Sequence, residues 1–308
     1  LGYAGGIPVR KGENYRFSCW YRLRTKGEAA VQIRLEDESG KRCLSQKELI
    51  LKERTWACLD CVLTAEETED AARLAILSRE PVILELDYVS LFPENTFLKR
   101  RNGLREDIAC LLRDMRPRFV RFPGGCLTHI GSLDSRDRAG MYRWKNTLGP
   151  THCRPARRNT WNYNQTLGLG FYEYFQFCED IGAEPLPVIA AGYDPHSLRS
   201  AALEDMQEWI DEALDLIEFA NGAPESRWGA VRAQMGHPES FHLKYLAIGN
   251  EEVGDDYFAR YEIMEKAIHE AYPQIWLINS AGPGSAGSEF RKGWEQARRT
   301  HTAYVDEH

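Results

Sequence analysis

Hydrophobic and polar positions alternate along the first ninety residues of the chain. Strict alternation that is rich in aromatic and β-branched residues is typical of half-buried β-strands. The pattern predicts strands at Tyr15–Leu23, Ala30–Leu35, Trp56–Leu63, Ala72–Leu77 and Val82–Leu91, with charged turns between them. No helical spacing interrupts these strands, so we expect residues 1–92 to form an antiparallel β-sandwich. Trp20, Tyr21 and Trp56 could stack on sugar rings if exposed, or belong to the core.

The pattern changes after Pro93, where helical spacing alternates with short apolar runs. Helices are predicted at Leu104–Met115, up to Ile181, and at Glu204–Asn221, Asp256–Ala271 and Glu289–Arg299. Strands are predicted at Phe119–Phe122, Leu186–Ala190, Lys244–Ile248, Ile275–Asn279 and Ala303–Val305. Strands that alternate with helices are typical of a parallel α/β fold.

A doubly wound sheet and a (β/α)8 barrel both have this alternation. No GxGxxG follows the first of these strands, and the chain contains no P-loop. Residues of chemical interest instead follow several different strands, which favours a barrel. A closed barrel needs about eight strand–helix units, and the pattern predicts five. We therefore expect residues 93–308 to form a partial barrel, and the chain to be part of a larger protein.

Composition narrows the classes of partner. The chain has 308 residues, of which 43% are hydrophobic, and its net charge is -7. No basic stretch is long enough to follow a phosphate backbone, which argues against a nucleic-acid partner. No apolar run has the length of a membrane span. The chain begins with Leu1 rather than Met, so its first residues do not tell whether the protein is secreted.

The eight cysteines have irregular spacing in a long chain. This pattern predicts free thiols in a reducing compartment rather than a disulfide framework. Cys58 and Cys61 have the spacing of half a zinc site, but no second pair follows. Side chains three residues apart in a strand point to opposite faces. We therefore predict no metal site.

The most informative segment is Leu246–Glu252, an apolar run that leads directly into a glycine, an amide and two carboxylates. A buried parallel strand would present the residue just past its carboxyl end at the mouth of a barrel. Glu251 could act there as a general acid or base if burial and a neighbouring carboxylate raise its pKa. Alternatively, both glutamates begin the next helix, where acids favour the positive end. That alternative suits Glu252 better than Glu251.

Arg121–Cys126 is the second candidate segment. An arginine at a strand end can fix the charge and orientation of a carboxylate, and the glycines that follow let backbone approach a ligand closely. The alternative is a tight turn with a structural salt bridge. Cys126 could be a nucleophile, but no histidine partner is evident from the sequence, which favours a packed thiol.

Glu307 follows the last predicted strand. Retaining glycoside hydrolysis needs an acid/base and a nucleophilic carboxylate, about 5 Å apart. Glu307 is a candidate for the second carboxylate. It could equally be a binding residue or an acid at the start of a helix.

The chain resembles the α-L-arabinofuranosidases of glycoside hydrolase family 51 in a set of motifs within residues 85–308. The matching stretches are Asp87–Pro93, Asn102–Arg105, Arg121–Cys126, Tyr142–Thr147, Gly149-Pro150, Gly168–Glu173, Cys178–Asp180, Gly249–Glu251 and Asp306–His308. Many barrel glycosidases share Asn-Glu, so Gly249–Glu251 alone would be weak, but the set is specific. The resemblance implies a (β/α)8 barrel with a carbohydrate-binding-like sandwich inserted after its first strand. Residues 1–92 would be that insert, and the five predicted strands would be the second to the sixth.

The resemblance also implies roles for individual residues. Glu251 matches the general acid/base, Asn250 the residue that holds the sugar 2-hydroxyl, and Arg121 an active-site arginine. Cys126, Glu307 and His308 lie in matching motifs and are implied to contact substrate. The family's nucleophile lies on the seventh strand, in a Gly-Glu-Tyr-like motif that this chain lacks.

The family pattern is not complete after Gly125. The segment Thr128–Gly131 lacks the acidic residue expected there, so its substrate contacts do not carry over.

We therefore expect a fragment of a retaining enzyme that removes terminal α-L-arabinofuranosyl residues from arabinose-containing saccharides. The fragment alone would be inactive, and the reaction needs no metal or organic cofactor. Family members are often oligomers, so a homo-oligomer is a candidate assembly. Two rivals remain: a non-catalytic carbohydrate-binding protein, and a related barrel glycosidase such as an endoglucanase or xylosidase.

Overall fold

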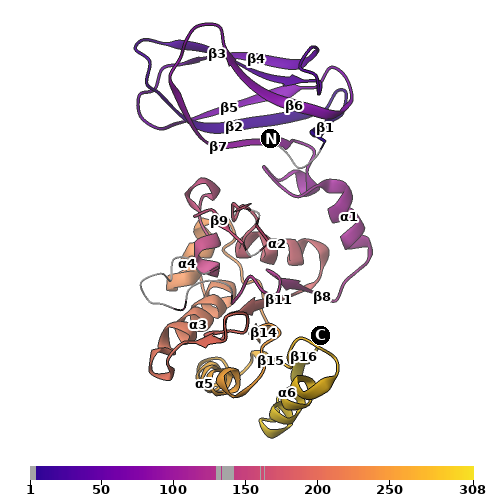
Figure 1. Ribbon diagram of the computed structural model, residues 1–308, viewed down its shortest axis with the longest axis vertical. Coiled ribbons are helices and arrows are strands. Elements are labelled where there is room, and N and C mark those ends of the chain that lie inside the picture. The colour runs from indigo at the N-terminus through magenta and orange to yellow at the C-terminus, as the bar shows by residue number, and fades with distance from the viewer. Residues whose placement is uncertain (1–4, 130–132, 134–141, 160, 163) are drawn as a thin grey trace. The chain divides into compact units, whose positions relative to one another are not determined.

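The computed structural model describes residues 5–129, 133, 142–159, 161–162 and 164–308. The chain divides into two compact units, Leu1–Met115 and Arg116–His308 (Figure 1). The helical residues between Pro93 and Met115 group with the first unit, beyond the boundary at 92/93 predicted from the sequence.

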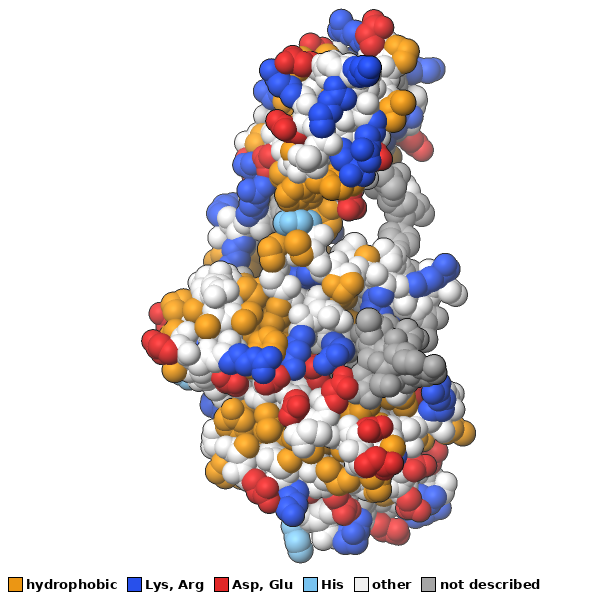
Figure 2. Space-filling view, turned by 90° about the vertical axis from the view of Figure 1, so that its left-hand side faces the viewer, with side chains coloured by type: hydrophobic (Ala, Val, Ile, Leu, Met, Phe, Trp, Pro, Cys, Tyr) orange, Lys and Arg blue, Asp and Glu red, His pale blue; other side chains and the backbone are white. Residues whose placement is uncertain are grey.

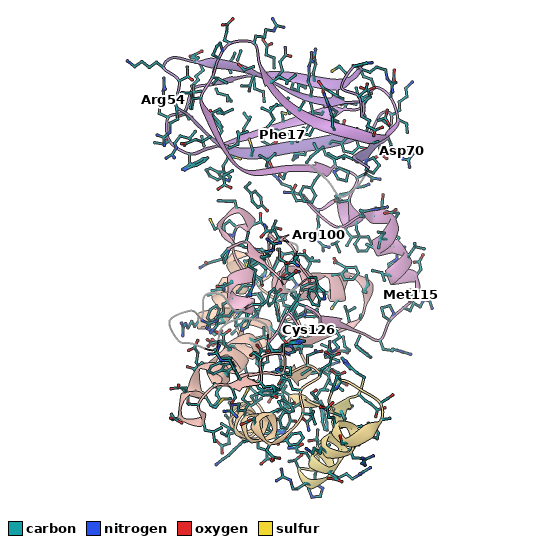
Figure 3. The ribbon with its side chains drawn as sticks, viewed as in Figure 1. Phe17, Arg54, Asp70, Arg100, Met115 and Cys126 are labelled. Atoms are coloured by element: carbon teal, nitrogen blue, oxygen red, sulfur yellow. The ribbon has the colours of Figure 1, made fainter. Side chains whose placement is uncertain are left out.

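The first unit contains an antiparallel sandwich of two sheets. The four-stranded sheet has the order β1 (Ile7–Val9), β6 (Glu69–Ser78), β3 (Ala29–Glu36) and β4 (Cys43–Leu51). The three-stranded sheet has the order β5 (Ala57–Thr64), β2 (Asn14–Leu23) and β7 (Leu84–Pro93). Every second residue of β2 is buried, as the alternating pattern predicts. Phe17 lies in the core between the sheets, whereas Arg54 and Asp70 lie at the surface (Figure 3).

Two strands of the sandwich are not predicted from the sequence. β1 has only three residues, and β4 carries three successive exposed polar residues in its middle, which hides the alternation. Cys61 packs against the sandwich core while Cys58 is exposed. Their thiols therefore face different environments, as strand geometry requires.

The second unit contains a five-stranded parallel sheet. Its strands follow one another in chain order: β8 (Phe119–Phe122), β11 (Glu184–Ile189), β14 (Tyr245–Ile248), β15 (Trp276–Ser280) and β16 (Tyr304–Asp306). A doubly wound sheet would reverse the strand order at a switch point. The uninterrupted order is that of a barrel wall, so this unit is part of a (β/α)8 barrel.

Helices α2 (Phe171–Ile181), α3 (Gln207–Asn221), α5 (Asp255–Ala271) and α6 (Gly287–Arg299) follow the strands (Figure 1). α1 (Glu106–Asp114) precedes β8. Short elements complete the described part of the chain: η1 (Phe97–Lys99), η3 (Trp144–Thr147), η4 (Thr151–Cys153), η5 (Leu203–Asp205), and the hairpins β9 (Arg157–Arg158) with β10 (Asn164–Gln165) and β12 (Tyr193–Asp194) with β13 (Arg199–Ser200).

One helix, α4 (Arg227–Gln234), is not predicted. It is short, contains Gly229, and has only two large apolar residues, Trp228 and Val231, that pack against the core. Tertiary contacts stabilise it instead. Arg232 is fully buried and donates hydrogen bonds to the carbonyl groups of Phe219, Gly222, His237 and Pro238.

The two faces of the parallel sheet have different environments. Residues such as Phe122, Ile189 and Leu246 pack against the helices in the main core. Leu186, Val188, Ala247 and Ile278 form a separate small cluster on the other face. A cavity of about 490 Å³ lies over that face. This is the side that becomes the interior of a barrel.

Acidic and basic side chains are interspersed on the face drawn in Figure 2. Within the described residues, no helix is long and apolar enough to cross a membrane.

Candidate active site

The candidate residues lie at the carboxyl ends of the parallel strands, which all meet at one edge of the sheet. Arg121 is the third residue of β8, Asn250 and Glu251 come just after β14, and His308 comes just after β16. Cys126 follows β8 and is half-buried (labelled in Figure 3). The structure brings these five residues together, although they come from three separate parts of the sequence.

Five side chains form a closed ring of polar contacts. Arg121 Nη2 donates to Asn250 Oδ1 and to Asp306 Oδ2, both at 2.7 Å. Asn250 Nδ2 donates to Glu251 Oε2 at 3.3 Å. Glu251 Oε1 lies 3.0 Å from His308 Nδ1, and His308 Nε2 lies 3.4 Å from Asp306 Oδ1. Each member therefore orients its neighbours.

Glu251 keeps a third of its side chain exposed, so its carboxyl group can reach a ligand. Partial burial raises the pKa of Glu251. The hydrogen bonds and charge of His308, together with contacts from Cys126 and Asn250, outweigh that effect and leave the pKa below its ordinary value. The sequence analysis named a raised pKa as the condition for acid/base catalysis, and in this chain His308 acts in the opposite direction.

Backbone geometry at two glycines allows this arrangement. Gly249 has a φ of 83° and is followed by Asn250, which is completely buried, and by Glu251 at a φ of 55°. A left-handed conformation is costly for a non-glycine residue and is often found at functional sites. A Cβ atom on Gly125 would lie 2.6 Å from Asn250 Oδ1. Glycine is therefore required where the β8 loop passes the Asn250 amide.

The structure does not bring Glu307 to the ring. Its Oε2 accepts a hydrogen bond from Trp294 Nε1 of α6 at 2.9 Å. Successive residues of an extended segment point to opposite sides, so Asp306 and His308 share one side and Glu307 takes the other. Asp306 was missed by the sequence analysis, although the period of two at the end of β16 could have identified it.

Cys126 has polar neighbours that the sequence analysis did not recognise. Its Sγ lies 3.7 Å from Glu251 Oε2, and its thiol lies close to the rings of His129 and His196. Burial, and next the nearby Glu251 carboxylate, raise the pKa of the Cys126 thiol. The group is therefore a thiol at neutral pH and not an activated thiolate.

Glu252 is completely buried and does not begin a helix, because α5 starts at Asp255. The expectation of a helix-start role was therefore wrong for Glu252, while Asp255 and Asp256 do lie in the first turn of α5. Glu252 Oε1 lies 3.3 Å from Nδ1 of His129, which is buried as well. Burial raises the pKa of Glu252 to about 7, against the opposing effect of His129. Ile130 and Gly131, in the loop that departs from the family pattern, lie outside the described residues.

Comparison with known proteins identifies the family of this chain. The sequence model of the alpha-L-arabinofuranosidase 1 domain matches residues 111–308, which is more than half of the chain. The chain belongs to the α-L-arabinofuranosidase family.

Members of this arabinofuranosidase family are similar over most of the chain. The chain is 40% identical to an extracellular exo-α-L-arabinofuranosidase from Streptomyces chartreusis over 316 residues, which cover 100% of the chain and 38% of the relative. It is 35% identical to α-L-arabinofuranosidase 1 from Arabidopsis thaliana, over 91% of the chain and 40% of the relative. The chain therefore spans less than half the length of these curated relatives.

Solved arabinofuranosidase structures share the fold. An arabinose-bound family 51 α-L-arabinofuranosidase superposes with a TM-score of 0.81 at 31% identity, over 91% of this chain and 45% of that one. A family 51 α-L-arabinofuranosidase from Bifidobacterium longum gives a TM-score of 0.55 at 23% identity, over 68% of this chain and 38% of that one. The partial barrel and the antiparallel sandwich are thus a fold found in this family.

Proposed function

We propose that the complete protein is a retaining, exo-acting α-L-arabinofuranosidase in which Glu251 is the general acid/base. One observation carries this proposal: Glu251 is held at a barrel mouth, partly exposed, by Asn250, His308 and Cys126. The names of the relatives support the sugar, an α-L-arabinofuranosyl residue. The partner is thus an arabinose-containing saccharide.

In the first step Glu251 protonates the glycosidic oxygen while a second carboxylate attacks the anomeric carbon. This forms a covalent glycosyl-enzyme and releases the leaving alcohol. In the second step Glu251 removes a proton from water, which displaces the carboxylate from the sugar. We assign the nucleophile to the part of the protein that this chain does not span, so that the 308 residues alone would not turn over substrate.

The low pKa of Glu251 in this chain is consistent with a two-carboxylate mechanism. An ionised nucleophile about 5 Å away would raise the pKa of Glu251 by like-charge repulsion and keep it protonated for the first step. Formation of the glycosyl-enzyme removes that charge. The pKa of Glu251 then falls again, which suits its role as a base in the second step.

Arg121 and Asn250 would position the sugar. Arg121 fixes the orientation of the Asn250 amide through Oδ1. The Asn250 amide nitrogen, now directed toward Glu251, can donate a hydrogen bond to a sugar 2-hydroxyl. Cys126 and His308 contact the same carboxylate and would line the subsite. Glu307 accepts a hydrogen bond from Trp294. We propose that this contact holds the strand end that carries Asp306 and His308, and that Glu307 is not a sugar ligand.

A panel of chromogenic glycosides tests this proposal with the complete protein. We expect hydrolysis of the α-L-arabinofuranoside, with the anomeric configuration of the first product retained in an NMR time course. Hydrolysis confined to β-xylosides or cellulosic substrates would replace the proposal with the related-glycosidase alternative. No hydrolysis of any member, together with saccharide binding, would support the non-catalytic alternative.

We also propose that the sandwich binds carbohydrate. Trp56 is 41% exposed and carries the Arg22 guanidinium 4.8 Å from its ring centre, whereas Tyr21 is buried in the core. The guanidinium lies over one face of the indole, so a sugar ring would stack on the other face. Trp56→Ala in the complete protein should reduce retardation in an arabinan or arabinoxylan affinity gel and leave hydrolysis of a small chromogenic substrate unchanged. Equal retardation of both proteins would remove Trp56 from this role.

A further inference from the structure

Three metal-ligating side chains converge beside Glu251. Cys126 and His129 come from the segment after β8, and His196 comes from the turn between β12 and β13. One potential ligand atom from each residue lies within 4.8 Å of the other two. The His196 backbone N–H and the Ser197 hydroxyl donate to the Asp194 carboxylate, which fixes the turn that carries His196.

His129 is the second observation that points to a ligand. It is 1% exposed, and among the described residues neither ring nitrogen has a hydrogen bond of normal geometry. Buried polar atoms are nearly always satisfied, so such a group requires an explanation. Nδ1 faces the buried Glu252 carboxylate at 3.3 Å. Nε2 is therefore the nitrogen left for an ion.

The carboxylate behind His129 strengthens this interpretation. Metal-bound histidines usually donate their second ring N–H to a carboxylate, which fixes the tautomer and increases ligand basicity. Glu252 is in that position. A thiolate and two imidazoles are ligands that suit zinc, and three protein ligands leave a fourth position open. His196 is exposed, which gives an ion a way in.

We propose that Cys126, His129 and His196 form a binding site for a divalent zinc ion. On binding, the Cys126 thiol releases its proton to solvent and a zinc–sulfur bond forms, while both imidazoles bind in their neutral form. Zinc–ligand distances are about 2.0–2.3 Å, so the ligand atoms must approach one another more closely than they do now. The exposed His196 side chain can make most of that movement.

The site adjoins the Glu251 carboxylate, whose Oε2 lies 3.7 Å from Cys126 Sγ. Glu251 has to reach the glycosidic oxygen from this position. If the proposed function holds, zinc therefore inhibits hydrolysis, because the ion and its fourth ligand occupy space beside the Glu251 carboxyl group. The ion takes no part in the reaction itself.

Zinc binding is tested on the complete protein after chelator treatment, without any substrate. Isothermal titration calorimetry should show that the protein binds one equivalent of zinc. Cys126→Ser, His129→Gln or His196→Gln should each reduce the affinity for zinc at least tenfold. Exposed residues of the same types provide matched controls, and Cys153→Ser and His269→Gln should bind as the wild type does. Cobalt loading should give a near-ultraviolet thiolate-to-metal band that Cys126→Ser abolishes. Equal stoichiometry and affinity in the wild type and the three ligand variants would overturn the proposal.

A separate experiment tests whether zinc inhibits hydrolysis. Zinc should reduce wild-type hydrolysis of a chromogenic arabinofuranoside, EDTA should restore it, and His196→Gln should remain active in the presence of zinc. Inhibition that persists in His196→Gln would show that the ion acts elsewhere. If no hydrolysis is found at all, the proposed function fails, while the calorimetric test of the zinc site is unaffected.

Discussion

His308 Nδ1 lies 3.0 Å from Glu251 Oε1, and this contact joins the segment after β16 to the segment after β14. The same imidazole contacts Asp306, which in turn accepts a hydrogen bond from Arg121. Two strands that are not neighbours in the sheet thus hold one carboxylate. The contact also lowers the pKa of Glu251, after burial has raised it.

Replacing His308 should move the pH dependence of hydrolysis. His308→Gln removes the group that lowers the pKa of Glu251, so this pKa rises and the carboxyl group stays protonated to higher pH. A general acid must be protonated in the free enzyme, so the basic limb of the kcat/KM profile should shift to higher pH. Glu307→Gln is the matched control, since Glu307 contacts Trp294 instead. An equal shift in both variants, or none in His308→Gln, would contradict this role of His308.

Glu251→Ala in the complete protein should reduce the turnover of ordinary arabinofuranosides by about 10²–10⁴-fold, the usual contribution of a general acid/base. A substrate with an activated leaving group can still pass the first step. Azide should then restore turnover, because a small anion attacks the glycosyl-enzyme without the help of a base. The measurement is the rate with and without azide, together with detection of the glycosyl azide. Unchanged turnover in the variant would remove Glu251 from the mechanism.

Gly125→Ala should impair both activity and stability. The added Cβ would lie 2.6 Å from Asn250 Oδ1 and 2.7 Å from its Nδ2, so the amide that bridges Arg121 and Glu251 must move. Overpacking of this kind costs typically 1–3 kcal/mol. Gly284→Ala is the control, since nothing but one carbonyl oxygen at 3.9 Å lies near its added Cβ. Thermal unfolding and kcat/KM of the two variants give the comparison, and equal behaviour would refute the close approach.

Glu252→Gln should change the pH dependence of stability. The pKa of Glu252 is raised from 4.5 to about 7 by burial. The native state therefore binds this proton more tightly than the unfolded state. The protonated Glu252 carboxyl group therefore contributes to the free energy of unfolding, fully below about pH 4.5. This contribution, at most about 3 kcal/mol, is lost as the pH rises toward 7.

Glutamine cannot ionise, so the free energy of unfolding of Glu252→Gln should gain on that of the wild type between pH 5 and 8. Denaturant unfolding of both proteins in the presence of EDTA measures this difference without interference from bound metal. If the free energies of unfolding of the two proteins change in parallel over that range, the pKa of Glu252 is not raised in the native state.

The sequence by itself determined the class of fold and the position of Glu251 in it. The alternating residues of β2 predict a strand with one covered face. The short apolar run of β14 is typical of a parallel strand that is buried on both faces. Parallel strands end at one edge, so residues that follow different strands, such as Arg121 and Glu251, lie at the same edge of the sheet. Weakly patterned elements escaped prediction, because β4 and α4 are stabilised by neighbours that are distant in the sequence.

Only the tertiary structure decided which groups act on Glu251. His308 is 57 residues away in the chain, and its contact lowers the Glu251 pKa, which burial alone would raise. The approach of His129 and His196 to Cys126 depends on two different loops. Hydrophobic periodicity records which face of an element is buried, whereas hydrogen bonds and charge pairs depend on distances of a few ångströms that only the folded chain sets.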